Sequence, residues 1–163
     1  RLSDGRWVPT FPRARYLFAR REWEHWTGED EEGTKRILAD SVAPVLEAGL
    51  AHLVEMDHRV ADGIWLEPTP GHTPGHVSVR LASDGAEAVI TGDLMHHPVQ
   101  VAEPGWQSSF DTDPTRARET RRAFCARYAD RPVAVLGTHF HHPTAGWIVS
   151  DRNGWRFSVD ARR

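Results

Sequence analysis

The segment TPGHTPGH, residues 69–76, is more informative about structure than any other stretch of this sequence. It follows a short apolar run that ends at Glu67-Pro68, and it leads into the alternating segment His76–Leu81, so we predict a loop between two strands. Its two glycines and two prolines favour a tight turn that leaves His72 just beyond a strand end. A lone histidine after Pro-Gly is most often an ordinary turn residue, so its meaning depends on the rest of the chain.

The same pattern occurs twice more, as an apolar strand that runs into a glycine and then a residue of metal-ligand type. Ala86–Thr91 leads to Gly92-Asp93, and Pro132–Gly137 leads to Thr138-His139. Because neighbouring strands can end close together, these side chains can converge. Two imidazoles and a carboxylate are good ligands for zinc, and the two carboxylate oxygens can bridge two cations. We therefore predict that His72, Asp93 and His139 form a metal site.

The other periodicities alternate between short strands and helices. Apolar spacing predicts a helix over Thr34–Ala48, which Pro44 kinks or shortens. Asp113 and Pro114 are the expected cap and first position of a second helix, whose apolar positions are Ala117, Ala123, Phe124 and Tyr128. We predict strands at Arg15–Ala19, Leu53–Glu55, Gly63–Leu66, His76–Leu81, Ala86–Thr91, Pro132–Gly137, Gly146–Ser150 and Trp155–Val159. This mixture predicts an α/β layered sandwich and one domain over residues 1–163.

Composition excludes several classes of function. The 163 residues carry 20 Lys plus Arg against 23 Asp plus Glu, so charge gives no reason to expect binding to nucleic acid or to an anionic membrane. No apolar run approaches the roughly 20 residues that span a bilayer. The single cysteine, Cys125, excludes an intrachain disulfide and a thiolate-rich zinc site, and we expect it to be buried packing. A reducing compartment, the cytoplasm, is the expected location.

Three stretches together resemble the later metal-binding motifs of metallo-β-lactamase-fold hydrolases. They are Thr69–His76, Ile90–Pro98 and Gly137–Phe140. The resemblance extends over most of the chain and is strongest to the branch that contains lactonases and organophosphate hydrolases. It implies an αββα sandwich with a centre of two zinc ions, or of other divalent metals. It also implies a first metal site completed by His72, a second that includes His139, and Asp93 as the catalytic bridge between them.

The implied reaction is hydrolysis of a small-molecule substrate. A hydroxide shared by the two metals would attack a lactone, an ester or a related bond. His96 follows Asp93 by three residues, where lactonases acting on acyl-homoserine lactones carry a tyrosine that touches the substrate. We expect His96 to contact substrate, and a histidine there disfavours that particular substrate. His76 begins a strand and is expected to support the site rather than to bind metal.

The sequence departs from the family in one respect. The first family motif, HxHxDH, supplies two ligands to each metal, and it occurs nowhere in these 163 residues. The family places it before a segment like Asp4–Thr10. We therefore expect that Arg1 follows a cut, that the N-terminal part of the fold is missing, and that this C-terminal fragment is inactive alone.

Other interpretations stay open. The chain could be a non-catalytic remnant or packing module of the same fold that binds metal weakly or not at all. A third interpretation within the same fold is a mononuclear-iron oxygenase or a thioesterase of glutathione conjugates. Proteins of this fold often pair, so a homodimer also remains open.

Overall fold

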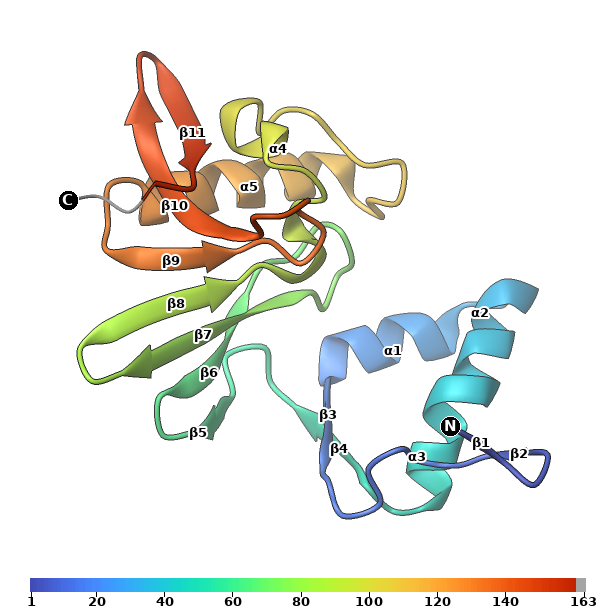
Figure 1. The fold of residues 1–163 in the computed structure, drawn as a ribbon. Coiled ribbons are helices and arrows are strands. Elements are labelled where there is room, and N and C mark those ends of the chain that lie inside the picture. The colour runs from blue at the N-terminus through green and yellow to red at the C-terminus, as the bar shows by residue number, and fades with distance from the viewer. Residues whose placement is uncertain (161–163) are drawn as a thin grey trace. The chain divides into compact units, whose positions relative to one another are not determined.

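The computed structural model describes residues 1–160, and its contacts divide the chain into two compact units (Figure 1). The first unit comprises Arg1–Glu55, and the second begins at Met56. The expectation of one domain remains a prediction. Among the described residues, no helix combines the length and the apolar character needed to cross a membrane.

The first unit combines two small sheets with three α-helices. Strands β3 and β4 pair in parallel, from Tyr16 opposite Ala51 to Ala19 opposite Val54. The predicted strand over Arg15–Ala19 is present as β3, and a helix follows it directly. The elements are β1 (Leu2–Ser3), β2 (Arg6–Trp7), β3 (Tyr16–Ala19), α1 (Arg20–Gly28), α2 (Glu32–Ile37), α3 (Ala43–Glu47) and β4 (Ala51–Val54).

The helix predicted over residues 34–48 is interrupted before Pro44. Its middle, Leu38–Val42, is a π-helical turn, and the Ala43 N–H donates to the carbonyl of Leu38, five residues earlier. Proline has no N–H to donate, and its ring crowds the carbonyl four residues before it, here that of Asp40. The wider turn accommodates the ring without ending the helical path, as π-bulges commonly do.

The second unit is built on a seven-stranded sheet with the order β11-β10-β9-β8-β7-β6-β5. All neighbours are antiparallel except β8 and β9, which run parallel. A turn at residues 151–154 closes the terminal hairpin, and its sequence Asp-Arg-Asn-Gly is typical of such turns. The strands are β5 (Arg59–Ala61), β6 (Ile64–Pro68), β7 (Val77–Ser83), β8 (Ala86–Ile90), β9 (Val133–Leu136), β10 (Ala145–Asp151) and β11 (Gly154–Ser158).

Helices α4 (Val99–Ala102) and α5 (Pro114–Tyr128) contact the β10–β11 side of this unit. The predicted cap of α5 is confirmed, because the Asp113 side chain accepts the N–H of Arg116 at 2.9 Å. The prediction of the apolar face of α5 is partly wrong. Ala123 is exposed, whereas Arg121 and Cys125 are fully buried.

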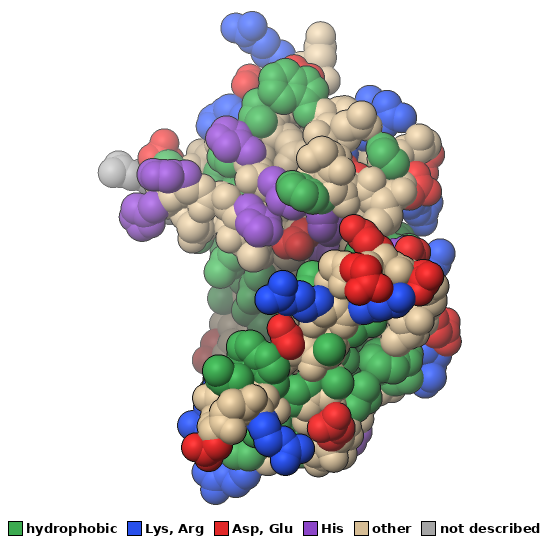
Figure 2. Space-filling model, turned by 90° about the vertical axis from the view of Figure 1, so that its right-hand side faces the viewer, with side chains coloured by type: hydrophobic (Ala, Val, Ile, Leu, Met, Phe, Trp, Pro, Cys, Tyr) green, Lys and Arg blue, Asp and Glu red, His purple; other side chains and the backbone are tan. Residues whose placement is uncertain are grey.

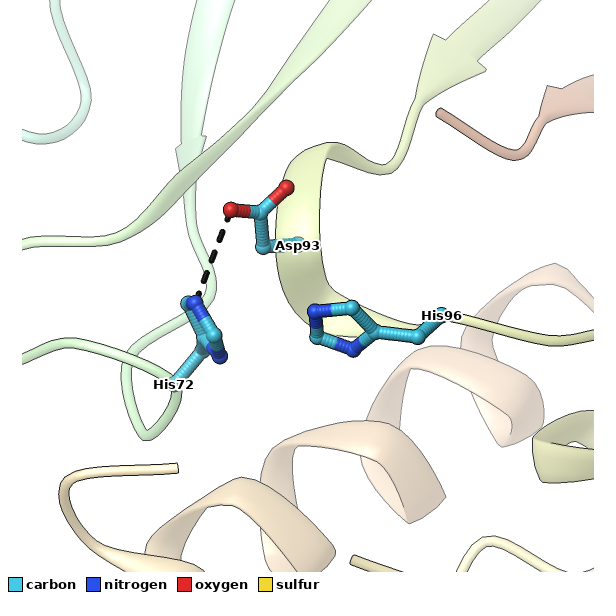
Figure 3. Close-up of side chains that lie close together, drawn as sticks. All are labelled: His72, Asp93 and His96. Atoms are coloured by element: carbon cyan, nitrogen blue, oxygen red, sulfur yellow. Dashed lines mark ion pairs between the residues drawn. The ribbon is translucent and has the colours of Figure 1, made fainter. Parts of the chain in front are cut away.

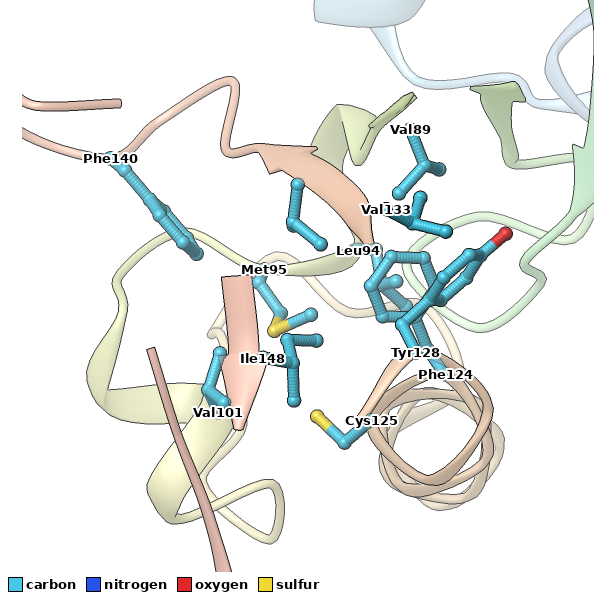
Figure 4. Packing of buried hydrophobic residues seen from close by; sticks show 11 residues of the cluster. Val89, Leu94, Met95, Val101, Phe124, Cys125, Tyr128, Val133, Phe140 and Ile148 are labelled. Atoms are coloured by element: carbon cyan, nitrogen blue, oxygen red, sulfur yellow. The ribbon is translucent and has the colours of Figure 1, made fainter. Parts of the chain in front are cut away.

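The main hydrophobic core of the second unit lies between α5 and the sheet (Figure 4). The expectation that Cys125 is packing is confirmed, because it has no exposed surface and lies beside Ile148 and Phe124 in this cluster. Val89 of β8 and Val135 of β9 are also fully buried. These two strands are therefore anchored just before the loops that carry Asp93 and His139.

Candidate metal centre

Asp93 and His139 lie together because β8 and β9 are parallel neighbours. The last paired residues are Ile90 and Leu136, and each polar residue follows its strand's last pair by three positions. The Thr91 N–H donates to the Leu136 carbonyl at 3.0 Å, which extends the pairing one step towards the loops. The parallel direction brings both strand ends to the same edge of the sheet.

The three predicted ligands converge around the carboxylate of Asp93. Nε2 of His139 lies 2.7 Å from Oδ1 of Asp93, and Nε2 of His72 lies 3.5 Å from Oδ2. His72 comes from the loop between β6 and β7, Asp93 from the 3-10 turn Gly92–Leu94 after β8, and His139 from the loop after β9, so three separate segments supply the group. The His72 side chain is 13% exposed, whereas those of Asp93 and His139 are almost half exposed. The group is therefore open to solvent on one side.

His96 belongs to the same cluster. Its ring centroid lies 5.0 Å from that of His72 and 4.8 Å from that of His139, with which it stacks. One ligand atom each from His72, Asp93 and His96 lies within 4.8 Å of the other two, and Figure 3 shows the His96 ring directed towards the other two side chains. Histidine side chains gather beside an acidic group on the face drawn in Figure 2.

His76 supports Asp93 rather than facing the cluster. The Asp93 backbone N–H donates to Nε2 of His76 at 2.8 Å, so that nitrogen must be unprotonated. The proton is then on Nδ1, which lies 2.9 Å from Oγ1 and 3.0 Å from the carbonyl of Thr69. Both ring nitrogens are used, which agrees with the supporting role expected for this histidine.

Gly92 allows His76 to approach. It has a φ of +57°, and a Cβ at this position would lie 2.7 Å from Nε2 of His76. A side chain here would therefore strain the backbone and displace the ring that holds Asp93. Gly137, before His139, has a different function. A Cβ there would overlap the ring of Phe140 at 2.2 Å, so this glycine makes room for packing.

Two residues that the sequence did not reveal lie behind His72. Oδ1 of Asp111 is 3.3 Å from Nδ1 of His72, and Oδ2 of Asp111 accepts from Nη1 of Arg121 at 3.2 Å. The side chains of Asp111 and Arg121 have no exposed surface. No pattern marks them, since Asp111 lies in an irregular loop and Arg121 in a helix rich in arginine.

The electrostatics of the cluster favour a neutral His96 and an ionised Asp93. Burial raises the pKa of Asp93, but the hydrogen bond of His139 and the positive charges that His139 and His72 carry when protonated outweigh it, so the pKa lies below its usual value. Burial lowers the pKa of His96, and the charges of His72 and His139 lower it further. Neutral imidazole and ionised carboxylate are the forms that bind metal.

The residues fit a divalent metal ion. His72, Asp93 and His96 offer two imidazoles and a carboxylate, a good donor set for zinc, and one ligand atom from each lies within 4.8 Å of the other two. The predicted ligand His139 is not in that group and meets it through the 2.7 Å contact of Nε2 with Oδ1 of Asp93. Within the described part of the chain, the buried Nδ1 of His96 has no hydrogen-bond partner. Nδ1 of His72 lies 3.3 Å from Asp111, while Nε2 of the same ring faces Asp93.

Comparison with solved structures identifies the architecture. The chain superposes on the hydrolase AbOPH of the beta-lactamase superfamily with a TM-score of 0.81 and 24% identity, covering 94% of this chain and 57% of that one. It superposes on AidC, a dizinc quorum-quenching lactonase, with a TM-score of 0.79 and 20% identity, covering 98% and 60%. The chain has the metallo-β-lactamase fold.

A third structure with this fold agrees. A probable metal-dependent hydrolase from Staphylococcus aureus has a TM-score of 0.67 and 17% identity, and the match covers 93% of this chain and 55% of that one. No family model and no curated protein matches the sequence. The chain spans less than two thirds of the length of these metallo-β-lactamase-fold structures, and the fold class inferred from the motifs is confirmed.

Proposed function

We propose that this chain carries part of the metal centre of a zinc-dependent hydrolase, with His72, Asp93 and His139 as ligands. One observation carries the proposal: the carboxylate of Asp93 directs Oδ2 towards one histidine and Oδ1 towards the other. A carboxylate placed between two imidazoles from different loops suits a bridge between two cations. AidC, which has the same fold, is described as a dizinc enzyme.

The proposed reaction is hydrolysis of a lactone, an ester or a related bond. Bound metal ions would supply an activated water and polarise the substrate oxygen. The chain's own contribution is positioning: His76 fixes the backbone of Asp93 through the bond to its N–H. The ring of His96 lies 5.0 Å from that of His72 and 4.8 Å from that of His139, and His96 is our candidate for contact with substrate. The AidC structure holds the product N-hexanoyl-L-homoserine, which is consistent with a carboxylate product.

The alternative is a module that packs within a larger protein and binds metal weakly or not at all. The direct contact of 2.7 Å between His139 and Asp93 favours it, because that hydrogen bond satisfies both groups without an ion. The sequence also holds no HxHxDH motif to supply the other ligands. The two functions predict different effects of zinc on hydrolysis by a chain that carries all the metal ligands.

Zinc titration and hydrolysis assays of this chain test the proposal. We expect little hydrolysis of lactone, phosphotriester and β-lactam substrates and weak zinc binding, because three ligands divided between two sites hold a metal poorly. Asp93→Ala should abolish even that binding and leave folding intact. Asp62→Ala, which removes a fully exposed carboxylate outside the cluster, is the matched control.

The outcomes separate the two functions. Zinc affinity that is equal in Asp93→Ala and wild type would remove Asp93 from the centre and favour the packing module. Tight uptake of two zinc ions by this chain would show instead that it needs no further ligands. Assay of a longer chain that includes an HxHxDH segment should show zinc-dependent turnover that Asp93→Ala abolishes.

A further inference from the structure

We propose that Asp111, held in place by Arg121, is a positioning residue that keeps the ring proton of His72 on Nδ1 and presents a bare Nε2 to a metal ion. The effect on metal binding rests on the proposed function. Its geometric basis is independent of any metal. The residues concerned all belong to the second unit.

The two oxygens of Asp111 have separate partners. Oδ2 accepts two hydrogen bonds, from the backbone N–H of Ser108 at 3.1 Å and from Nη1 of Arg121 at 3.2 Å. Oδ1 faces only Nδ1 of His72 among the contacts of the described residues, at 3.3 Å. Both members of the Asp111–Arg121 pair are fully buried. A buried guanidinium needs a carboxylate beside it, so the pair is fixed in charge as well as in position.

This arrangement determines which nitrogen of His72 carries the proton. An ionised carboxylate can only accept hydrogen bonds, so Nδ1 of His72 must donate to Asp111. In a neutral imidazole the other nitrogen, Nε2, is then an acceptor. It faces Oδ2 of Asp93, also an acceptor, at 3.5 Å. Two acceptors directed at each other repel unless a cation lies between them, and either a metal ion on Nε2 or a second ring proton there supplies it.

Backbone contacts fix the distance between Asp111 and His72. The N–H of Thr112 donates to the carbonyl of His72 at 2.9 Å, and the N–H of Asp113 donates to the carbonyl of Gly71 at 3.0 Å. Gly71 permits this approach, because its φ is +136° and a Cβ there would lie 2.3 Å from the backbone nitrogen of Ala117. The start of α5 and the TPGHTPGH loop are thus joined next to the Asp111–His72 contact.

A purely structural role is the competing explanation. Nε of Arg121 donates to the carbonyl of Pro104 at 3.2 Å, so the ion pair also ties the loop before α5 to the helix. If that were its whole function, the proton on His72 would not depend on Asp111. The position of that proton therefore separates the two explanations.

The positioning role and the purely structural role predict different results for the Asp111→Asn variant. The amide has one acceptor, and the donors from Arg121 and Ser108 should hold it at the Oδ2 position. The NH₂ group would then face Nδ1 of His72, which would have to accept, and the ring proton would move to Nε2. Zinc affinity should fall about 10–100-fold, as it does when carboxylates behind metal-bound histidines are removed.

The measurement is long-range ¹H–¹⁵N NMR of the His72 ring in the zinc-free chain, in mildly alkaline buffer where imidazole is neutral. Zinc affinity is measured in parallel by competition with a chromophoric chelator. Thr120→Val is the matched control, because its hydroxyl ties α5 to the same loop through the Pro70 carbonyl at 2.6 Å. It makes no contact with Asp111 or His72 that the structure records, so the tautomer should not change.

A second variant guards against misfolding. Asp111→Leu with Arg121→Met replaces the buried pair by apolar side chains, a change that proteins often tolerate. It should give a mixture of His72 tautomers. An Nδ1–H tautomer retained in both variants, or already absent from wild type, would overturn the proposal. If the tautomer changes as expected but wild type binds no zinc, the proposed function fails and the assignment of the proton stands.

Discussion

Replacing Gly92 by alanine tests whether the close approach of His76 holds Asp93 in place. The left-handed backbone alone costs a non-glycine residue roughly 1–2 kcal/mol. The new Cβ would also lie 2.7 Å from Nε2 of His76 and push away the ring that accepts the Asp93 N–H. Loss of a partly buried hydrogen bond adds about 1–2 kcal/mol. The total expected loss of unfolding free energy is about 2–4 kcal/mol.

Gly85→Ala provides the matched control. Gly85 has a φ of +79° in the β7–β8 turn, but a Cβ there meets nothing within 4 Å. It should cost the backbone term alone, roughly 1–2 kcal/mol. Urea unfolding of both variants gives the difference. In a His76→Ala background the ring is gone, so Gly92→Ala should cost no more than Gly85→Ala. Equal losses for the two glycine variants, or additive effects in the double-mutant cycle, would refute the reasoning.

Two further measurements test the environments of single side chains. Burial raises the pKa of the Cys125 thiol to about 12. Iodoacetamide should therefore leave the folded chain unmodified and add one label after unfolding. Labelling of the native chain would contradict the burial of Cys125. The pKa of His96 is lowered in the folded chain, so the unfolded chain binds a proton first as the pH falls. The stability that is present above about pH 6.5 is therefore lost below it. His96→Asn should reduce this loss in urea unfolding of the zinc-free chain, and an unchanged pH dependence would show that His96 does not contribute.

The strands and the three loops of the candidate centre were predictable from the sequence because their information is local. Each of His72, Asp93 and His139 follows an apolar run that reads as a strand, with a glycine directly or two residues before it. The structure brings the three side chains together, and their roles as ligands remain a prediction. The fold class followed from the same stretches.

The contacts behind His72 were not predictable, since they depend on residues far apart in the chain. Asp111 meets His72 across 39 positions, and nothing near Asp111 distinguishes it from a surface acid. Arg121 lies in a helix where arginine normally faces solvent, and only packing against Asp111 and Pro104 accounts for its burial. The prediction that Ala123 lies on the apolar face was wrong for the same reason, because the core that α5 covers determines which side of the helix is buried.

The parallel pairing of β8 and β9 has a consequence for how this centre can vary. The separation of Asp93 from His139 is set by hydrogen bonds across two neighbouring strands, not by the length of the 40-odd residues that connect them. That connection carries α4, Asp111 and α5. Its exposed stretch around Trp106 could therefore be lengthened or cut, as in a circular permutant, while both side chains kept their spacing. A slip of one residue in the pairing, by contrast, would shift one strand end relative to the other and change the separation of Asp93 from His139.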